Sequence, residues 1–326
     1  MAAPEPLSRG AILEPQTHRR AASASARPAR AGRSRRLPRP LAAYPALFWW
    51  GVFFVIPLGW MGYYSLGVKP ADLAAGAVSL DDLSLANYGA ATSEIFLKVF
   101  WITIRTGLLG TLACAVVGFP VAYALANYVS ERWRAVLLFL LVLPYWTSFL
   151  LRTFAWRIIL APEGTLSTAL RALNILDQPL LILDTNAAVQ LGIIYNYLPL
   201  MILPMYVALE RIDPALRSAS MDLGAGPLRT FFSVTVPLAA PGILGGLLLT
   251  FILATSDYVV PAILGGARGL MVGNLVASQI LASQNLPLGS AMAILLIGML
   301  AGVVLAIGLA LWATRAALRL LRGRAV

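Results

Sequence analysis

Five long stretches of the chain contain no charged residue. They run over Pro40–Val68, Thr106–Ser130, Thr185–Leu209, Thr230–Ser256 and Gly269–Thr314. A helix needs roughly 20 apolar residues to cross the hydrocarbon core of a bilayer. Only 12% of the residues are charged, against about 25% in soluble domains. The chain is therefore predicted to cross a membrane several times.

Six membrane spans are predicted by hydropathy, at about residues 41–66, 96–128, 133–160, 187–209, 237–265 and 289–314. The first is longer than the apolar core of a signal peptide and lacks an obvious small-residue cleavage site, so we interpret it as a retained span. The predicted fold is an all-α integral membrane protein with six transmembrane helices. We expect a disordered basic cytoplasmic tail (1–40), a six-helix domain (41–320) containing a loop over 210–237, and a cytoplasmic end (321–326).

Basic residues are distributed unevenly between the spans. Nine arginines precede residue 40, and a cytoplasmic N-terminus would place 18 of the 25 Lys and Arg residues on the cytoplasmic side. Cytoplasmic segments of membrane proteins are enriched in Lys and Arg. We therefore predict cytoplasmic N- and C-termini. The net charge of +11 is explained by basic residues that are distributed as in a membrane protein. The lipid membrane is therefore an expected partner, and nucleic acid is not.

Cys114 is the only cysteine and His18 the only histidine. A single cysteine inside an apolar run excludes an intrachain disulfide and a thiolate metal site. A single histidine in the polar tail excludes Ser-His catalysis in the membrane region. We expect no catalytic residue, no metal and no cofactor in this chain.

A short helix is predicted between the fourth and fifth spans. Asp213 is suited to the N-cap, Pro214 to the first helical position and Gly224 to the C-terminal cap. Small and apolar side chains recur on one face of this helix, at Leu216, Ala219, Ser220 and Leu223. Such a face is able to lie against another surface. A second short helix is expected to begin at Pro227.

The loop resembles the signature of binding-protein-dependent ABC importer permeases, which reads Glu-Ala-Ala, three residues, Gly, and a spacer ending in a hydrophobic-Pro pair. Here Ser218-Ala219-Ser220 precedes Gly224, and the spacer ends at Val236-Pro237. Because Ser218 replaces the signature glutamate, the electrostatics of docking to the ATPase are expected to differ. The resemblance implies that these residues couple the chain to the ATPase: Asp213, Ser218, Ala219, Met221, Asp222, Gly224 and Pro237.

Four further segments resemble the spermidine/putrescine subfamily of these permeases. They are Leu143–Trp156, Tyr195–Pro204, Asp257–Gly266, and Met271–Gln279 with Leu286–Gly289. The resemblance covers nearly the whole chain after residue 40 and implies a type I ABC importer permease fold. It also implies a location in the bacterial inner (plasma) membrane. The partners it implies are a second homologous permease, two cytoplasmic ATP-binding subunits, and a periplasmic or extracellular solute-binding protein. The chain has no Gly-x-x-x-x-Gly-Lys-Ser/Thr motif, so ATP hydrolysis is expected in the separate subunits.

Three charged residues fall inside predicted spans, namely Arg105, Arg152 and Asp257. A charge at mid-span costs at least about 2.5 kcal/mol, so each one needs a partner or water. We interpret both arginines as structural. Asp257 allows two interpretations: a carboxylate that attracts a cation on the translocation path, or a structural partner of Arg152 or Arg105.

Aromatic rings and one amide accompany Asp257 in these spans. The rings of Tyr145, Trp146, Tyr195, Tyr197 and Tyr258 are suited to cation-π contacts with an ammonium group, although packing is the simpler explanation of each ring taken singly. Asn196, which precedes Pro199 and Pro204, is a candidate for a polar lining. The predicted substrate-pathway residues are Asp257, Tyr258, Trp146, Tyr195 and Asn196. The glycines predicted to permit close helix packing are Gly245, Gly246, Gly298, Gly302 and Gly308.

The function that these features predict is the non-catalytic permease subunit of an ATP-driven importer. The expected cargo is a small organic cation, such as spermidine or putrescine, carried by alternation between inward-open and outward-open states. One alternative is a permease of the same kind for another small organic solute. Another is an ion-coupled secondary transporter, which would be expected to have more intramembrane carboxylates and an inverted repeat.

Overall fold

The protein is described by a computed structural model over residues 39–70 and 77–323. The predicted basic tail lies, up to residue 38, outside the described residues, as do the last three residues. The chain divides into two compact units, one ending at Phe54 and one beginning at Val55. Within the described ranges there is no β-strand, only an isolated antiparallel bridge between Val68 and Ser79.

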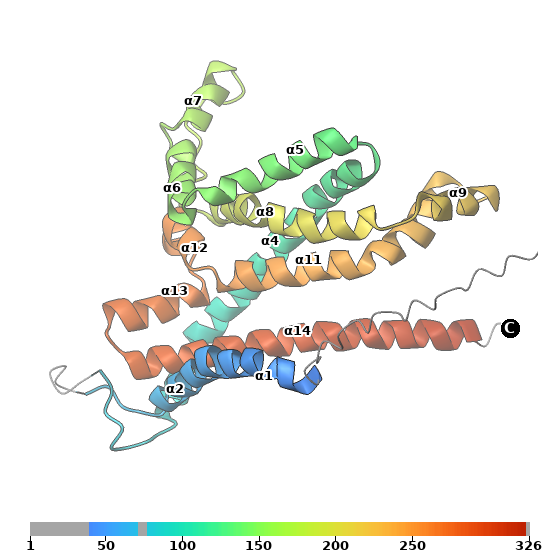
Figure 1. Ribbon diagram of the computed structural model, residues 1–326. Coiled ribbons are helices and arrows are strands. Elements are labelled where there is room, and N and C mark those ends of the chain that lie inside the picture. The colour runs from blue at the N-terminus through green and yellow to red at the C-terminus, as the bar shows by residue number, and fades with distance from the viewer. Residues whose placement is uncertain (1–38, 71–76, 324–326) are drawn as a thin grey trace, which may run out of the picture. The chain divides into compact units, whose positions relative to one another are not determined.

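The described residues are otherwise helices and short loops (Figure 1). The α-helices are α1 (Arg39–Trp50), α2 (Ile56–Tyr64), α3 (Ala86–Ala91), α4 (Glu94–Asn127), α5 (Glu131–Val142), α6 (Phe149–Leu160), α7 (Thr165–Ala172), α8 (Asn186–Glu210), α9 (Pro214–Asp222), α10 (Pro227–Thr230), α11 (Val236–Ser256), α12 (Val259–Leu264), α13 (Val272–Ala277) and α14 (Leu286–Gly323). Segments of 3₁₀ geometry are η3 (Leu143–Trp146) and η5 (Gly266–Arg268). Segments of π geometry are η1 (Gly51–Val55), η4 (Phe231–Thr235) and η6 (Ser278–Ala282).

Five continuous helical segments in the described part of the chain are long and apolar enough to cross a membrane. They are Tyr44–Tyr64, Glu94–Asn127, Asn186–Glu210, Pro227–Ser256 and Leu286–Leu309. A sixth candidate is the pair Glu131–Trp146 and Phe149–Ala172. The all-helical fold with up to six spans is thereby confirmed.

Two of the predicted spans differ from what the sequence indicated. The predicted span over 133–160 is bent by 91° between Trp146 and Phe149. Pro144 starts a 3₁₀ turn there and Thr147 has extended backbone, so the chain leaves the helix before α6 begins. The predicted fifth span, 237–265, begins earlier, at Pro227, and ends at Ser256, where Asp257 takes an extended conformation.

The main core lies where α4, α8 and α11 pack against one another. Helix α8 contributes the fully buried side chains of Ile193, Met201 and Met205. A second core lies where the N-terminal half of α4 meets α3, α13 and α14. Helix α4 therefore takes part in both cores.

Close approach of the helices depends on small residues at a few positions. A Cβ added at Gly242 of α11 would lie 2.5 Å from the carbonyl oxygen of Pro204 on α8. Gly246 likewise faces Met201, as predicted from the sequence. At the other four glycines a Cβ would meet no described atom of this chain within 4 Å, so they do not lie at contacts between its described helices: Gly245, Gly298, Gly302 and Gly308.

Gly242 and Gly245 form a matched pair for testing the contact between α8 and α11. We expect Gly242→Ala to lower the free energy of unfolding by about 1–3 kcal/mol, because the added methyl group meets rigid backbone. Gly245→Ala, with open space around it, should be neutral or stabilising by up to about 1 kcal/mol. Thermal unfolding of the purified protein in detergent measures both changes. Equal Tm values for the two variants would contradict the packing described.

Candidate functional site

The helix predicted in the 210–237 loop is present as α9. Asp213 Oδ1 accepts a hydrogen bond from Ala215 N at 2.9 Å, and Pro214 occupies the first helical position, where no N–H is needed. Gly224 follows the helix with a φ of +85°, which is the left-handed region that glycine adopts most easily. The helix, both of its caps and the second helix beginning at Pro227 are confirmed.

Apolar side chains of α9 and of the segment after it are exposed. Leu223 is 89% exposed, and Met221, Leu228 and Phe232 are exposed as well. Asp222, the last residue of α9, is exposed as well, and α9 itself follows directly after the span formed by α8. Clustered apolar side chains around a charged segment are typical of a surface that another protein covers. The described part of the chain leaves this surface uncovered.

The two serines that replace signature residues differ in their contacts. Ser220 Oγ lies 3.0 Å from Thr230 Oγ1 and so joins α9 to α10. Ser218 is exposed, and its Oγ is 3.5 Å from Pro214 O, which is at the limit of a hydrogen bond. Ser218 and the exposed Ala219 therefore face outward from α9, without the negative charge of a glutamate.

Pro237 lies in the first turn of α11, directly after the π segment η4. Because helical backbone precedes α11 directly, a proline here leaves a carbonyl of the preceding turn without its usual N–H partner, and the π segment lies at this irregular point. A π turn inside a longer helix often accompanies a functional site. The loop from α9 to Pro237 thus ends in a locally irregular stretch of an otherwise continuous span, Pro227–Ser256.

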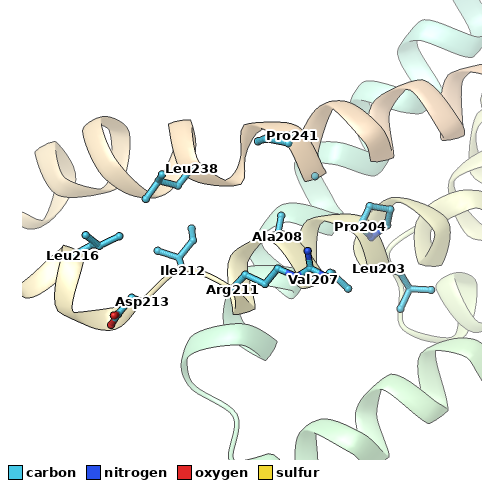
Figure 2. Close-up of a pocket in the computed structure, with 11 residues that line it drawn as sticks. Leu203, Pro204, Val207, Ala208, Arg211, Ile212, Asp213, Leu216, Leu238 and Pro241 are labelled. Atoms are coloured by element: carbon cyan, nitrogen blue, oxygen red, sulfur yellow. The ribbon is translucent and has the colours of Figure 1, made fainter. Parts of the chain in front are cut away.

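An apolar groove of about 760 Å³ runs beside α9, between the end of α8 and the start of α11 (Figure 2). Ile212 and Leu216 lie across this groove from Leu238 of α11. Arg211 and Asp213 are the charged residues that line it. Because the groove separates α9 from part of α11, the contact between these two helices is incomplete.

Asp257 lies in the break between α11 and α12 and is only 8% exposed. Its Oδ1 accepts hydrogen bonds from Val259 N (2.8 Å) and Val260 N (3.2 Å). Its Oδ2 accepts one from the hydroxyl of Tyr197 on α8, at 3.0 Å. The carboxylate therefore caps α12 and fastens the break to α8. An ion pair of Asp257 with either span arginine is not formed among the described residues.

A second polar contact joins the bent pair α5–α6 to α8. The Tyr145 hydroxyl donates to the carbonyl oxygen of Asn196, and the Arg152 guanidinium lies 4.7 Å from the centroid of the Tyr145 ring. Asn196 is buried, and its Nδ2 donates to Gly192 O at 3.0 Å. Its Oδ1 has no partner among the described residues. Since a buried amide oxygen normally accepts a hydrogen bond, Asn196 has an acceptor left for water or a solute.

The aromatic residues of the predicted pathway set are more exposed. Trp146 is exposed with its ring against Phe139, and Tyr258 is exposed just after Asp257. Tyr195 is partly covered by Trp156, with ring centroids 5.3 Å apart. The structure thus places Asp257 and Asn196 in the interior and the three rings nearer the surface.

The sequence identified Tyr145 and Tyr197 only as aromatic rings. In the structure their hydroxyl groups make the contacts described above, with Asn196 O and with Asp257 Oδ2. No motif in the sequence indicates these pairings, which join segments 51 and 60 residues apart. The sequence does show that Asp257 is a charged residue within a span, and such a residue needs a hydrogen-bond donor or another partner nearby.

The sequence profile of one protein family matches residues 86–321. This family is described as the binding-protein-dependent transport system inner membrane component. The spermidine/putrescine transport system permease protein PotB of Haemophilus influenzae is 38% identical over 212 residues, covering 65% of this chain and 74% of the relative. PotB of Escherichia coli K12 is 34% identical over 246 residues, covering 73% of this chain and 89% of the relative.

A solved structure shares the fold. It is the crystal structure of a bacterial alginate ABC transporter in complex with an alginate pentasaccharide-bound periplasmic protein. One of its chains matches with a TM-score of 0.64 at 16% identity, covering 82% of this chain and 91% of that chain. At this identity the likeness concerns the fold alone.

Substitution of Asp257 tests its role as the cap of α12. We expect Asp257→Ala to lower the free energy of unfolding by about 2–4 kcal/mol, because the cap is lost and the Tyr197 hydroxyl is left without its acceptor. Asp257→Asn keeps an oxygen for the backbone N–H groups and should cost less than about 1 kcal/mol. Tyr197→Phe, which removes only one hydrogen bond, serves as the control. Thermal unfolding in detergent gives the order, and an equal loss in both Asp257 variants would contradict it.

Proposed function

The chain belongs to the family of binding-protein-dependent transport system inner membrane components, and from this premise we propose that it is the permease subunit of an ATP-driven polyamine importer. The observation that carries the proposal is the exposed face of α9, a short capped helix between two spans with no described element covering it. The 34–38% identity to two permease proteins of spermidine/putrescine systems supports the cargo class. The chain is a multi-pass protein of the inner membrane.

Two cytoplasmic ATP-binding subunits are proposed partners in the complex, and α9 is the proposed surface at which this chain contacts the ATPase. Met221 and Leu223 supply apolar contact, and Asp222 supplies a charge at the rim. Ser218 and Ala219 lie on the same helix, so the contact there is made without the signature glutamate. Hydrolysis of ATP takes place in these subunits, and this chain receives the resulting movement.

The proposed orientation places α9 and both termini in the cytoplasm. The distribution of Lys and Arg over the sequence supports this orientation. The segments from α12 to α13 then lie toward the outer surface, at the opposite end of α11 from α9 (Figure 1). A solute-binding protein would approach from that side, and a second homologous permease would complete the translocation path.

The proposed path for the solute follows the polar and aromatic residues around the break after α11. Tyr258 and Trp146 present exposed rings for cation-π contact with an ammonium group, and Tyr195 presents a partly covered one. Asn196 has an unused amide oxygen, which is suited to accept a hydrogen bond from an amine. The negative charge of Asp257 behind Tyr258 favours a cation over a neutral or anionic solute.

Another organic solute remains an alternative cargo, because the alginate transporter shares this fold. The deciding experiment is uptake of labelled spermidine and putrescine into proteoliposomes that contain the full complex, with the solute-binding protein outside. We expect uptake that requires hydrolysable ATP and is reduced by competition between the two polyamines. ATP-dependent uptake of a different solute, with no competition by either polyamine at the binding protein, would overturn the polyamine assignment and leave the permease assignment intact.

Gly224 allows the coupling role of the loop to be tested separately. We expect Gly224→Val to abolish ATP-coupled uptake while insertion into the membrane is kept, because a β-branched residue is strained at a φ of +85° and α9 would end differently. Gly226→Val is the matched control, since Gly226 has an ordinary φ of −65° and open space around it. Uptake in proteoliposomes and membrane content by immunoblot are the measurements. Normal uptake by Gly224→Val would remove the loop from the coupling mechanism.

A further inference from the structure

The side chain of Arg217 on α9 contacts α4, a helix that is distant from α9 in the sequence. The backbone of α9 packs against α10 and η4, which follow it directly in the chain. Arg217, in contrast, reaches the C-terminal end of α4, 90 residues earlier. Its Nη1 donates to Asn127 Oδ1, and its guanidinium carbon lies 5.9 Å from the centroid of the Tyr123 ring.

Asn127 is held in the orientation that this contact needs. Its Nδ2 donates to Tyr123 O at 2.8 Å, one turn back along α4. With the amide nitrogen engaged, the amide oxygen is turned toward Arg217. An arginine bonded to an oriented acceptor and placed over an aromatic ring has two independent contacts that fix its position.

The end of α4 is itself fixed to its neighbours. The Tyr123 ring meets the ring of Phe231 in η4 edge to face, with centroids 5.7 Å apart, and Phe119 meets the same ring at 5.7 Å. Arg134 forms a 3.0 Å ion pair with Glu210 at the end of α8. The same guanidinium donates to two carbonyl oxygens at the end of α4, those of Ala126 and Val129, at 3.4 and 3.3 Å.

Helix α4 extends from this end to the opposite side of the bundle. With 34 residues it is about 51 Å long, more than the thickness of the hydrocarbon core. At its other end Thr103 Oγ1 accepts a hydrogen bond from Val272 N, at the start of α13, at 2.9 Å. Gly107 of α4 lies directly against Thr255, two residues before Asp257. A displacement of α4 therefore reaches the break between α11 and α12.

We propose that Arg217 is a positioning residue that makes α9 and the end of α4 move as one body. Movement of α9 then enters the bilayer through α4 as well as through the covalently attached α8 and α11. This inference rests on the proposed function, in which the ATP-binding subunits displace α9. Arg217 touches neither solute nor nucleotide in this scheme, and it acts through Asn127 and Tyr123.

Substitutions at both ends of the contact test the proposal in the reconstituted complex. Arg217→Gln and Asn127→Leu each break the contact, and the double variant should be no worse than either alone. Asn127→Asp offers Arg217 a carboxylate and should keep coupling. Arg229→Gln removes the same charge from the exposed Arg229 of neighbouring α10 and is the matched control.

The measured quantity is the number of polyamine molecules taken up per ATP hydrolysed, together with the amount of ATP-binding subunit that co-purifies. We expect both contact-breaking variants to keep their partners and to hydrolyse ATP, while the uptake-to-hydrolysis ratio falls about tenfold. A ratio equal to that of the unsubstituted complex in Arg217→Gln, or additive losses in the double variant, would overturn the proposal. Absence of ATP-dependent uptake in the unsubstituted complex would instead overturn the proposed function.

A distance measurement tests the proposal first with Arg217 intact and then with Arg217 substituted. Spin labels are attached through Ala215→Cys on α9 and Val121→Cys on α4, and the only native cysteine, Cys114, is buried and stays unlabelled. We expect the distance between the labels to be the same with and without trapped ATP, and to change with ATP once Arg217→Gln is added. A change with ATP in the doubly labelled parent would show that α9 and α4 move separately.

Discussion

Backbone N–H and C=O groups inside a bilayer have no water to bond to, so every interruption of a spanning helix must be closed by other protein groups. In the described part of the chain, one candidate span is interrupted between α5 and α6, and the backbone also breaks where another span ends, between α11 and α12. Asp257 closes the second with a carboxylate that accepts two backbone N–H groups and the hydroxyl of Tyr197. Beside the first, Tyr145 donates to a carbonyl oxygen of α8. Both interruptions are therefore held by α8, which places the irregular backbone against the most buried helix of the fold.

The position of α8 depends in turn on how closely α4 and α11 approach it. Lipid tails are as apolar as leucine side chains, so burial of apolar surface does little to bring helices together in a membrane, and contact between surfaces has to do more. Gly242 of α11 meets Pro204 of α8, and Gly110 of α4 meets Ile193 of α8. At these points a glycine without a side chain faces the neighbouring helix, so the helices approach closely. The tyrosine hydroxyls of α8 and η3 are then near enough to reach their acceptors. The hydrogen bonds at the two breaks therefore depend on the close packing of α4, α8 and α11.

The sequence predicted the features that depend on local chemistry. Uncharged runs located the spans, and the succession of Asp213, Pro214 and Gly224 predicted both ends of α9, because caps are set by residues within one turn. Of the glycines at contacts it predicted Gly246 but not Gly242, since a contact depends on what the facing helix places opposite the glycine. The 91° bend also escaped prediction, because proline occurs in straight spans as well, as Pro199 in α8 demonstrates. The contact of Arg217 with Asn127 had no sequence signal at all.

The two regions that the sequence identified separately, the loop around α9 and the charged break at Asp257, lie at opposite ends of α11. A helix with a π segment at its start and a proline in its first turn is poorly suited to carry a displacement along its own axis without bending. Helix α4 also contains a proline near α9, Pro120, but it continues as one α-helix from Glu94 to Asn127 without a π segment. It contacts α9 through Arg217 and Asn127, and the start of α13 through Thr103. Under the proposed role of Arg217, α4 therefore gives the movement of α9 a second route into the bilayer, beside the π segment.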